Sequence, residues 1–207
     1  MIQPKLTIAI PTIEKRKEYF NNLLLEFRHQ SEPYGEDIEI IWESDNGEMS
    51  IGNKRNILYQ KSNGLYTVQW DDDDWICQNG IDKIMNAIET NADVITYNNY
   101  TDIEQWGKHR NFHKYISIKN NPPIIDYDNN QIFSSPDQKS VIKTEIARQV
   151  KFYDMNHSED RFFMRDILPF LKTEFLINEF IYLYLNKTGQ SMNPYERYKI
   201  EKSSKLI

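Results

Sequence analysis

The sequence has a single cysteine, Cys77, and lacks any long hydrophobic run. One cysteine excludes an intrachain disulfide, so a reducing cytoplasm is the expected compartment. The first apolar run, Leu6–Ile10, is too short for the core of a signal peptide. No segment approaches the ~18 apolar residues of a membrane-spanning helix. These absences predict a soluble, cytoplasmic chain without a membrane segment.

Positive charge is also scarce: 25 Lys and Arg residues stand against 31 Asp and Glu residues, for a formal net charge of −6. An acidic chain is poorly suited to broad, sequence-independent binding of nucleic acid, which needs a basic surface. Hydrophobic residues make up 39% of the chain and charged residues 27%, as in ordinary globular proteins. With 207 residues, we expect one well-packed domain.

Strand-like and helix-like segments alternate over the first hundred residues. The predicted order is strand Leu6–Ile10, helix Glu14–Gln30, strand Ile38–Trp42, helix Ile51–Ser62, strand Leu65–Trp70, a helix with an Ile81, Ile84, Met85, Ile88 stripe, and strand Val94–Tyr100. This order predicts an α/β fold with a largely parallel sheet. Such sheets bind ligands beyond the carboxyl ends of their strands. We therefore expect Pro11–Glu14, Asp45 and Asp71–Asp74 along one edge.

The second half of the sequence is less regular. Segments Ser140–Lys143 and Phe175–Leu185 are predicted to be strands, and a helix is predicted to start at Thr144. Glu159–Leu168 is predicted to be a helix with Phe163 and Ile167 on its apolar side.

Four consecutive aspartates, Asp71–Asp74, follow an apolar predicted strand. Adjacent carboxylates repel one another, and a divalent cation relieves that repulsion. Carboxylate oxygens are ligands suited to Mg²⁺ or Mn²⁺, which usually add water and substrate phosphates to their coordination shell. If the chain stays extended, Asp71 and Asp73 share one face while Asp72 points elsewhere. A solvated acidic loop is the alternative interpretation.

The stretch SIGNKRNILYQKSNGLYTVQWDDDDW resembles the central signature of family 2 glycosyltransferases with the GT-A fold. The Pro-Thr after the first strand and the segment IEIIWESDN are similar to further parts of that family, although Ser44 stands where an acid is common. The resemblance implies a Rossmann-like, mostly parallel sheet flanked by helices. It also implies a single GT-A domain over 1–207, with a nucleotide-sugar-binding half (1–100) and an acceptor-binding half with a C-terminal tail (101–207).

The same resemblance implies roles for single residues. Asp71–Asp73 corresponds to the Asp-x-Asp motif, in which Asp73, assisted by Asp71, ligates a Mn²⁺ or Mg²⁺ ion on the donor diphosphate. Asp72 is placed to meet the ribose or the sugar. The implied donor-binding residues, with a UDP-sugar favoured, are Pro11, Thr12, Glu14, Asp45, Lys54, Arg55, Asp71 and Asp72.

An inverting transfer needs a base that takes the proton of the acceptor hydroxyl as it attacks. The pair Glu159-Asp160 resembles the Glu-Asp motif that follows the Asp-x-Asp motif in this family. The resemblance implies that Asp160 is the base and Glu159 its neighbour or an acceptor contact. Helix capping after Ser158 is the alternative role for these acids.

The acceptor is open at the level of sequence. A glycan is the first expectation and a hydroxymethylated base in phage-type DNA the second, with Lys108–Lys114 and Lys187–Lys205 as the candidate phosphate contacts. Two other functions remain: a non-catalytic module that binds nucleotide sugars, and a nucleotidyltransferase. The latter usually has a glycine-rich phosphate loop, and Thr12–Lys17 contains no glycine.

Overall fold

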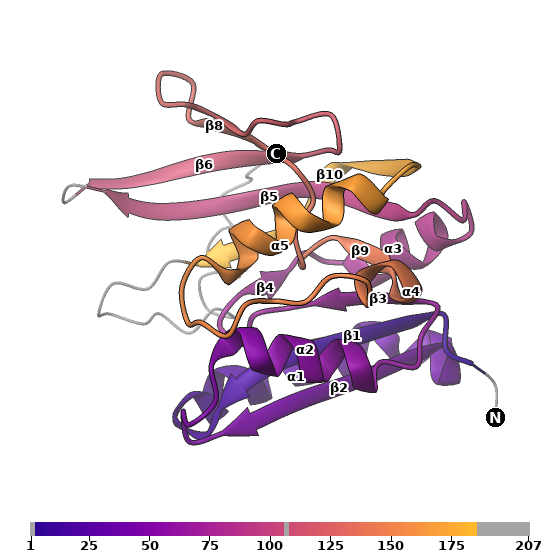
Figure 1. The fold of residues 1–207 in the computed structure, drawn as a ribbon. Coiled ribbons are helices and arrows are strands. Elements are labelled where there is room, and N and C mark those ends of the chain that lie inside the picture. Colours follow the sequence, from indigo (N-terminus) through magenta and orange to yellow (C-terminus); the bar gives the residue numbers. More distant parts are fainter. Residues whose placement is uncertain (1–2, 106–107, 186–207) are drawn as a thin grey trace.

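The computed structural model describes residues 3–105 and 108–185, which form a sheet flanked by helices (Figure 1). The centre of the sheet has the strand order β2-β1-β3. Strand β1 (Leu6–Ile13) pairs in parallel with β2 (Ile38–Asp45) on one side and with β3 (Tyr66–Gln69) on the other. The carboxyl ends of all three strands therefore lie at one edge, as the sequence predicts.

The rest of the sheet continues beyond β3. Strand β9 lies antiparallel between β3 and β5, so β5 runs parallel to β3, and β10 pairs in parallel with β5. The hairpin partner of β5 is β6, which is followed by β8 and β7 at the far edge, while the short β4 pairs with β10. These strands are β4 (Trp75–Ile76), β5 (Val94–Gln105), β6 (Lys108–Ile116), β7 (Ile124–Asp126), β8 (Gln131–Ser134), β9 (Val141–Lys143) and β10 (Glu174–Leu185).

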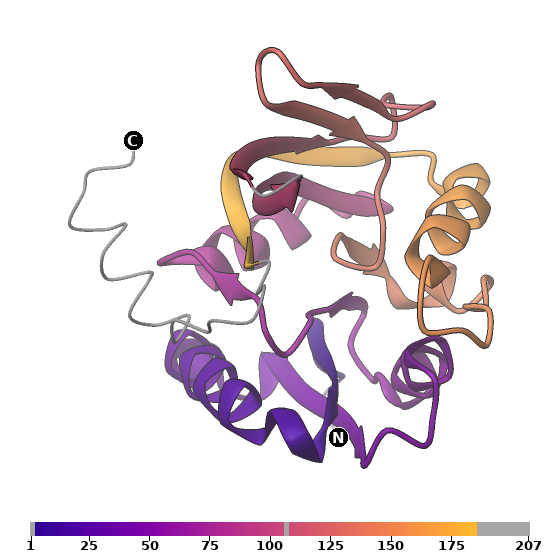
Figure 2. The same ribbon diagram turned by 90° about the vertical axis from the view of Figure 1, so that its left-hand side faces the viewer.

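Helices cover both faces of the sheet, with α1 and α3 on one face and α2, α4 and α5 on the other (Figure 2). Their bounds, with those of the short 3₁₀ turns, are α1 (Lys17–Ser31), α2 (Ile51–Lys61), α3 (Gly80–Ile88), α4 (Thr144–Ala147), α5 (Glu159–Ile167), η1 (Glu14–Arg16), η2 (Glu32–Asp37) and η3 (Leu168–Phe170). No helix in the described part of the chain has the length and apolar character needed to cross a membrane.

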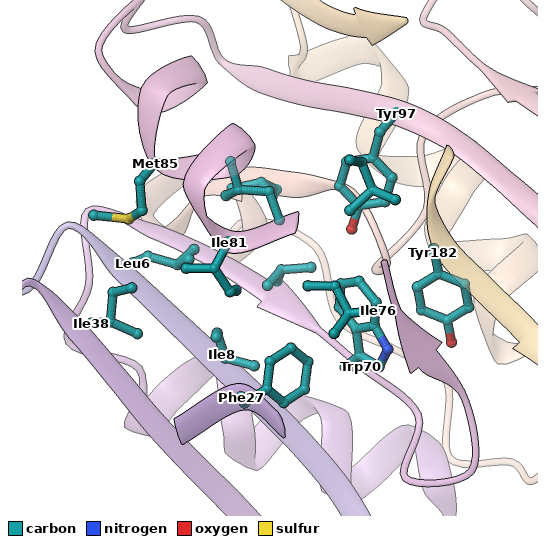
Figure 3. Packing of buried hydrophobic residues seen from close by; sticks show 14 of the residues in the cluster. Leu6, Ile8, Phe27, Ile38, Trp70, Ile76, Ile81, Met85, Tyr97 and Tyr182 are labelled. Atoms are coloured by element: carbon teal, nitrogen blue, oxygen red, sulfur yellow. The ribbon is translucent and has the colours of Figure 1, made fainter. Parts of the chain in front are cut away.

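Each face of the sheet has its own apolar core. On the α1/α3 face, Phe27 packs edge-on against Trp70 at 5.3 Å between ring centroids, and Tyr182 lies 4.5 Å from the same indole (Figure 3). On the other face, Phe152 and Phe163 stack at 4.3 Å. The core on the α1/α3 face includes Ile10 of β1 and Trp70 directly after β3, so the loops that leave these strands start from rigid positions.

Strand β1 does not stop at Pro11, where the sequence predicts its end, but continues to Ile13. The Trp70 amide donates to the Ala9 carbonyl, and β3 ends beside Ala9. The backbone nitrogen of Pro11 therefore faces the side on which β3 has already ended. Because no strand lies there to accept a hydrogen bond, the absence of an N–H group in proline costs the sheet nothing. The remaining predicted elements are present, with ends that differ by a few residues.

Gly64 generates a stability prediction, because it lies directly against β1. A Cβ atom at this position would come within 2.6 Å of the Thr7 backbone nitrogen and 2.8 Å of the Leu6 carbonyl carbon. We expect Gly64→Ala to lower the free energy of unfolding by about 2 kcal/mol or more, since backbone cannot yield as a side chain can. Urea denaturation measures the difference.

Gly35→Ala is the matched control. Gly35 has open space around its Cβ position but a φ of +52° with a ψ of −122°, so we expect only the strained backbone conformation to contribute, on the order of 1–3 kcal/mol. A loss of less than about 1 kcal/mol in Gly64→Ala would contradict the steric explanation for Gly64.

Candidate active site

The aspartate run forms a turn, so the extended chain under which Asp71 and Asp73 would share a face is not what the structure has. The Asp74 amide donates to the Asp71 carbonyl at 3.2 Å. The side chain of Asp74 is buried and accepts a hydrogen bond from the Tyr182 hydroxyl of β10. This anchor from a distant strand holds the bend of the chain, in which Asp71 and Asp72 meet different partners.

Asp71 is held from both sides by cations. Arg55 Nη2 lies 2.7 Å from Asp71 Oδ1, and Lys139 Nζ lies 3.5 Å from Asp71 Oδ2. Burial alone would raise the pKa of Asp71, but Arg55 and Lys139 outweigh it and hold the pKa well below its ordinary value. Asp71 therefore stays ionised at any pH at which the protein works.

Arg55 joins three elements through one guanidinium group. Besides Asp71, it contacts Gln69 Oε1 at the end of β3 at 3.3 Å and Glu159 Oε1 at the start of α5 at 3.4 Å. The Gln69 amide returns a hydrogen bond to the Arg55 carbonyl. Arg55 is 3% exposed, so its position on α2 is a buried junction and not a solvated helix face.

Lys54 is buried in the same way. Its ammonium group donates to the Thr12 carbonyl at 2.7 Å and pairs with the Asp45 carboxylate. Asp45 also accepts the amides of Gly47 and Met49. Burial works against it, yet these partners lower the pKa of Asp45 below its ordinary value. Lys54 thus ties the end of β1 to the end of β2.

Asp72 turns towards β1. Its Oδ2 atom accepts from the Thr12 hydroxyl at 2.7 Å, and its Oδ1 atom accepts from Arg16 Nη1 at 2.9 Å. Burial raises the pKa of Asp72 above its ordinary value in spite of both partners. The same nitrogen of Arg16 lies 3.5 Å from Asp73 Oδ2, and Asp73 is the more exposed of these two carboxylates.

A pocket of about 700 Å³ opens over these groups. Six predicted donor-binding residues and both predicted metal ligands line it, together with Glu159; they are Pro11, Thr12, Lys54, Arg55, Asp71, Asp72 and Asp73. The predicted residues Glu14 and Asp45 are not part of its lining. Glu14 accepts from Ser44 and pairs with Lys17, whereas Asp45 holds Lys54 from behind.

A second pocket, of about 640 Å³, adjoins the first, and Tyr184 lines both. Asp160 lines the second pocket while its neighbour Glu159 lines the first. The Ser158 side chain forms no capping hydrogen bond with α5, and Glu159 is engaged with Arg55. Lys139 lines the second pocket and reaches Asp71 of the first.

The carboxylates fit a cation that is held partly by substrate phosphate. Across the described residues, no group of three or more His, Cys, Asp or Glu side chains is arranged to hold a metal ion. Asp71 and Asp72 already have close partners, which leaves Asp73 as the most available ligand. Mg²⁺ and Mn²⁺ commonly bind through one or two carboxylates plus water and phosphate oxygens.

Sequence reasoning missed several lining residues. Arg16, Tyr19, Asn156 and Tyr184 belong to the first pocket, and Lys139 to the second. Arg16 stands only three residues beyond β1, a position that could have been found. Tyr19 and Tyr184 lie in a predicted helix and a predicted strand, but nothing local marks them as lining residues, and Asn156 and Lys139 lie between the predicted elements. Of the candidate phosphate contacts, the side chains of 108–110 and the whole of Lys187–Lys205 lie outside the described residues, as does the C-terminal tail.

Comparisons with known proteins give matches only among solved structures: no protein-family model and no curated protein matches the chain. A structure of S. aureus TarS 1–349 in complex with UDP-GlcNAc matches with a TM-score of 0.60 and 12% identity, over 90% of this chain and 60% of that one. The mannosyltransferase PcManGT from Pyrobaculum calidifontis, in complex with GDP-Man and Mn²⁺, matches with a TM-score of 0.53 and 11% identity, over 100% and 63%.

The chain spans less than two thirds of the length of either structure. At these identities the likeness concerns the path of the backbone, and it agrees with the parallel sheet, the flanking helices and the fold class predicted from the sequence. The chain has the GT-A fold, the nucleotide-diphospho-sugar transferase fold.

Proposed function

We propose that the protein is an inverting, metal-dependent glycosyltransferase that transfers a sugar from a nucleotide-sugar donor, with a UDP-sugar favoured. One observation carries the proposal: the pocket over the aspartate run shares Tyr184 with a second pocket, and consecutive carboxylates of α5 line one pocket each. A transferase needs this arrangement because donor and acceptor must meet at one reacting atom. The ligands named for TarS and PcManGT, UDP-GlcNAc and GDP-Man with Mn²⁺, support the choice of donor class.

The first pocket is the proposed donor site. Thr12, near the end of β1, is proposed to contact the nucleoside, and Asp73 is the proposed metal ligand, with Asp71 assisting. A bound Mn²⁺ or Mg²⁺ would stabilise the negative charge that the leaving diphosphate gains. Arg55 contributes fixed positive charge behind Asp71. Lys54 donates to the Thr12 carbonyl and pairs with Asp45. It thereby holds the ends of β1 and β2 together at the pocket.

The second pocket is the proposed acceptor site, and Asp160 is the proposed base. Its Oδ1 atom accepts only a backbone amide, that of Arg161, among the hydrogen bonds found in the described part of the chain. No ion pair of Asp160 is found among the described residues, although Lys139 acts on it electrostatically at longer range. A carboxylate without a close ion pair can take the proton of an attacking hydroxyl. Glu159, bound to Arg55, orients the start of the helix that carries Asp160.

A glycan remains the first candidate for the acceptor, ahead of a hydroxymethylated DNA base. Two of the cations that line the second pocket are already paired: Lys114 with Asp137 at 3.2 Å, and Lys139 with Asp71. Paired cations offer little to a nucleic-acid backbone, whose binding depends on phosphate neutralisation. On this proposal the halves 1–100 and 101–207 divide donor binding from acceptor binding.

The metal role of Asp73 yields a binding prediction. We expect Asp73→Ala to lower the affinity for UDP in Mn²⁺ about tenfold or more, to the level measured without metal, because the bridge to the diphosphate is lost. Calorimetric titration with UDP, GDP and dTDP, each with and without Mn²⁺, measures it. Asp128→Ala, which removes the same charge from an exposed loop, is the control. If none of the three nucleotides binds to the wild type, the donor proposal is wrong.

The base role of Asp160 yields a kinetic prediction. Asp160→Asn keeps the shape of the side chain, so UDP binding should be unchanged, whereas turnover should fall about 10²- to 10⁴-fold. Metal-dependent hydrolysis of a panel of UDP-sugars measures turnover without knowledge of the acceptor. Asp166→Asn, on the same helix and paired with Arg165, is the control and should stay active. Near-wild-type turnover in Asp160→Asn would remove Asp160 from the mechanism.

These two assays and a third, for pyrophosphate release, distinguish the other functions. Binding of UDP-sugars without any turnover in the wild type would indicate a non-catalytic binding module. Release of pyrophosphate from a nucleoside triphosphate and a sugar phosphate would indicate a nucleotidyltransferase.

A further inference from the structure

Arg16 occupies the space between two carboxylates of the aspartate run. A single nitrogen, Nη1, lies 2.9 Å from Asp72 Oδ1 and 3.5 Å from Asp73 Oδ2. The guanidinium group therefore bridges the two side chains from the pocket side, as a divalent cation would. It belongs to the lining of the first pocket, and the sequence resemblance gives it no role.

Arg16 and the two carboxylates that it bridges differ in how freely they can move. Asp72 is fixed: its side chain is 2% exposed and its second oxygen is held by Thr12. Asp73 is 26% exposed, and Arg16 is 46% exposed at the end of the short turn η1. Half-exposed ion pairs are weak because water competes for both partners. Arg16 is therefore the group that can leave, and the carboxylates are those that stay.

We propose that Arg16 is a positioning residue that takes the place of the divalent cation in the metal-free protein, so that the aspartate run binds this cation well only together with a diphosphate. A guanidinium group matches phosphate oxygens through paired N–H donors. A diphosphate that enters the pocket can therefore accept hydrogen bonds from Arg16. Asp73 is then free to ligate the cation. The role of the diphosphate rests on the function proposed above; the competition between Arg16 and the cation does not.

The lack of a complete protein cage for a metal in the described residues agrees with this role. The aspartate run offers at most a few carboxylate oxygens to the cation, and the positive charge of Arg16 already lies beside them. Arg16 therefore lowers the affinity for the free cation. A ligand that draws Arg16 away must therefore raise the affinity of the site for the cation. By thermodynamic reciprocity, the cation raises the affinity of the site for that ligand by the same factor.

Binding of Mn²⁺ alone, followed by the electron paramagnetic resonance signal of free Mn²⁺, tests the proposal. Arg16→Ala should bind Mn²⁺ about tenfold more tightly than the wild type, since a unit charge close to the site is removed. Lys17→Ala is a matched control: it removes the same charge from the next residue, whose side chain is 71% exposed and lies 3.9 Å from Glu14. Its affinity should stay within about twofold of the wild type.

Arg16→Lys keeps the charge and should bind Mn²⁺ as the wild type does, which separates charge from any change in folding. Repeating the titrations with saturating UDP should reduce the difference between Arg16→Ala and the wild type to about twofold. The proposal is wrong if Arg16→Ala binds free Mn²⁺ no more tightly than Lys17→Ala. If UDP binds to none of the variants, the proposed function fails, and the Mn²⁺ comparison still decides the role of Arg16.

Discussion

The site depends on one buried guanidinium group, that of Arg55. It is 3% exposed and connects Gln69 on β3, Asp71 in the turn and Glu159 on α5. Taking one charge out of such a cluster leaves its partners buried and unpaired, which typically costs about 3–5 kcal/mol. Helix α2 therefore acts as the shared support of both pockets: it fixes the aspartate run on one side and the start of the helix that carries Asp160 on the other.

Charges of alternating sign continue from this junction into the second half of the chain. Lys139 lies between Asp71 and Asp137, and Asp137 pairs with Lys114 on β6. Burial would raise the pKa of Asp137, yet these two lysines hold it below its ordinary value. Because every carboxylate in this series has a cation beside it, the cluster is buried without a large net charge. At the first pocket this leaves Asp73, with Arg16 beside it, as the more exposed carboxylate and the one better placed to meet a ligand.

Much of the first half could be predicted from the sequence, because its strands and helices have clear apolar periodicity and its motif is compact. Local patterns placed Lys54 and Arg55 on α2 beside the strand ends, although not as buried residues. The bend of the aspartate run could not be predicted: it depends on Tyr182, 108 residues beyond Asp74. Lys139 was missed for the same reason, since its role arises only from a contact made across the fold.

The order Glu159-Asp160 explains how one helix can serve two pockets. Successive residues of an α-helix point about 100° apart, so adjacent carboxylates cannot face the same partner, whereas residues four apart would. Glu159 uses its direction to meet Arg55 beneath the first pocket, and Asp160 is thereby turned towards the second. The position of the proposed base is thus set by its neighbour Glu159, and a shift of Arg55 would displace the proposed metal site and the proposed base together.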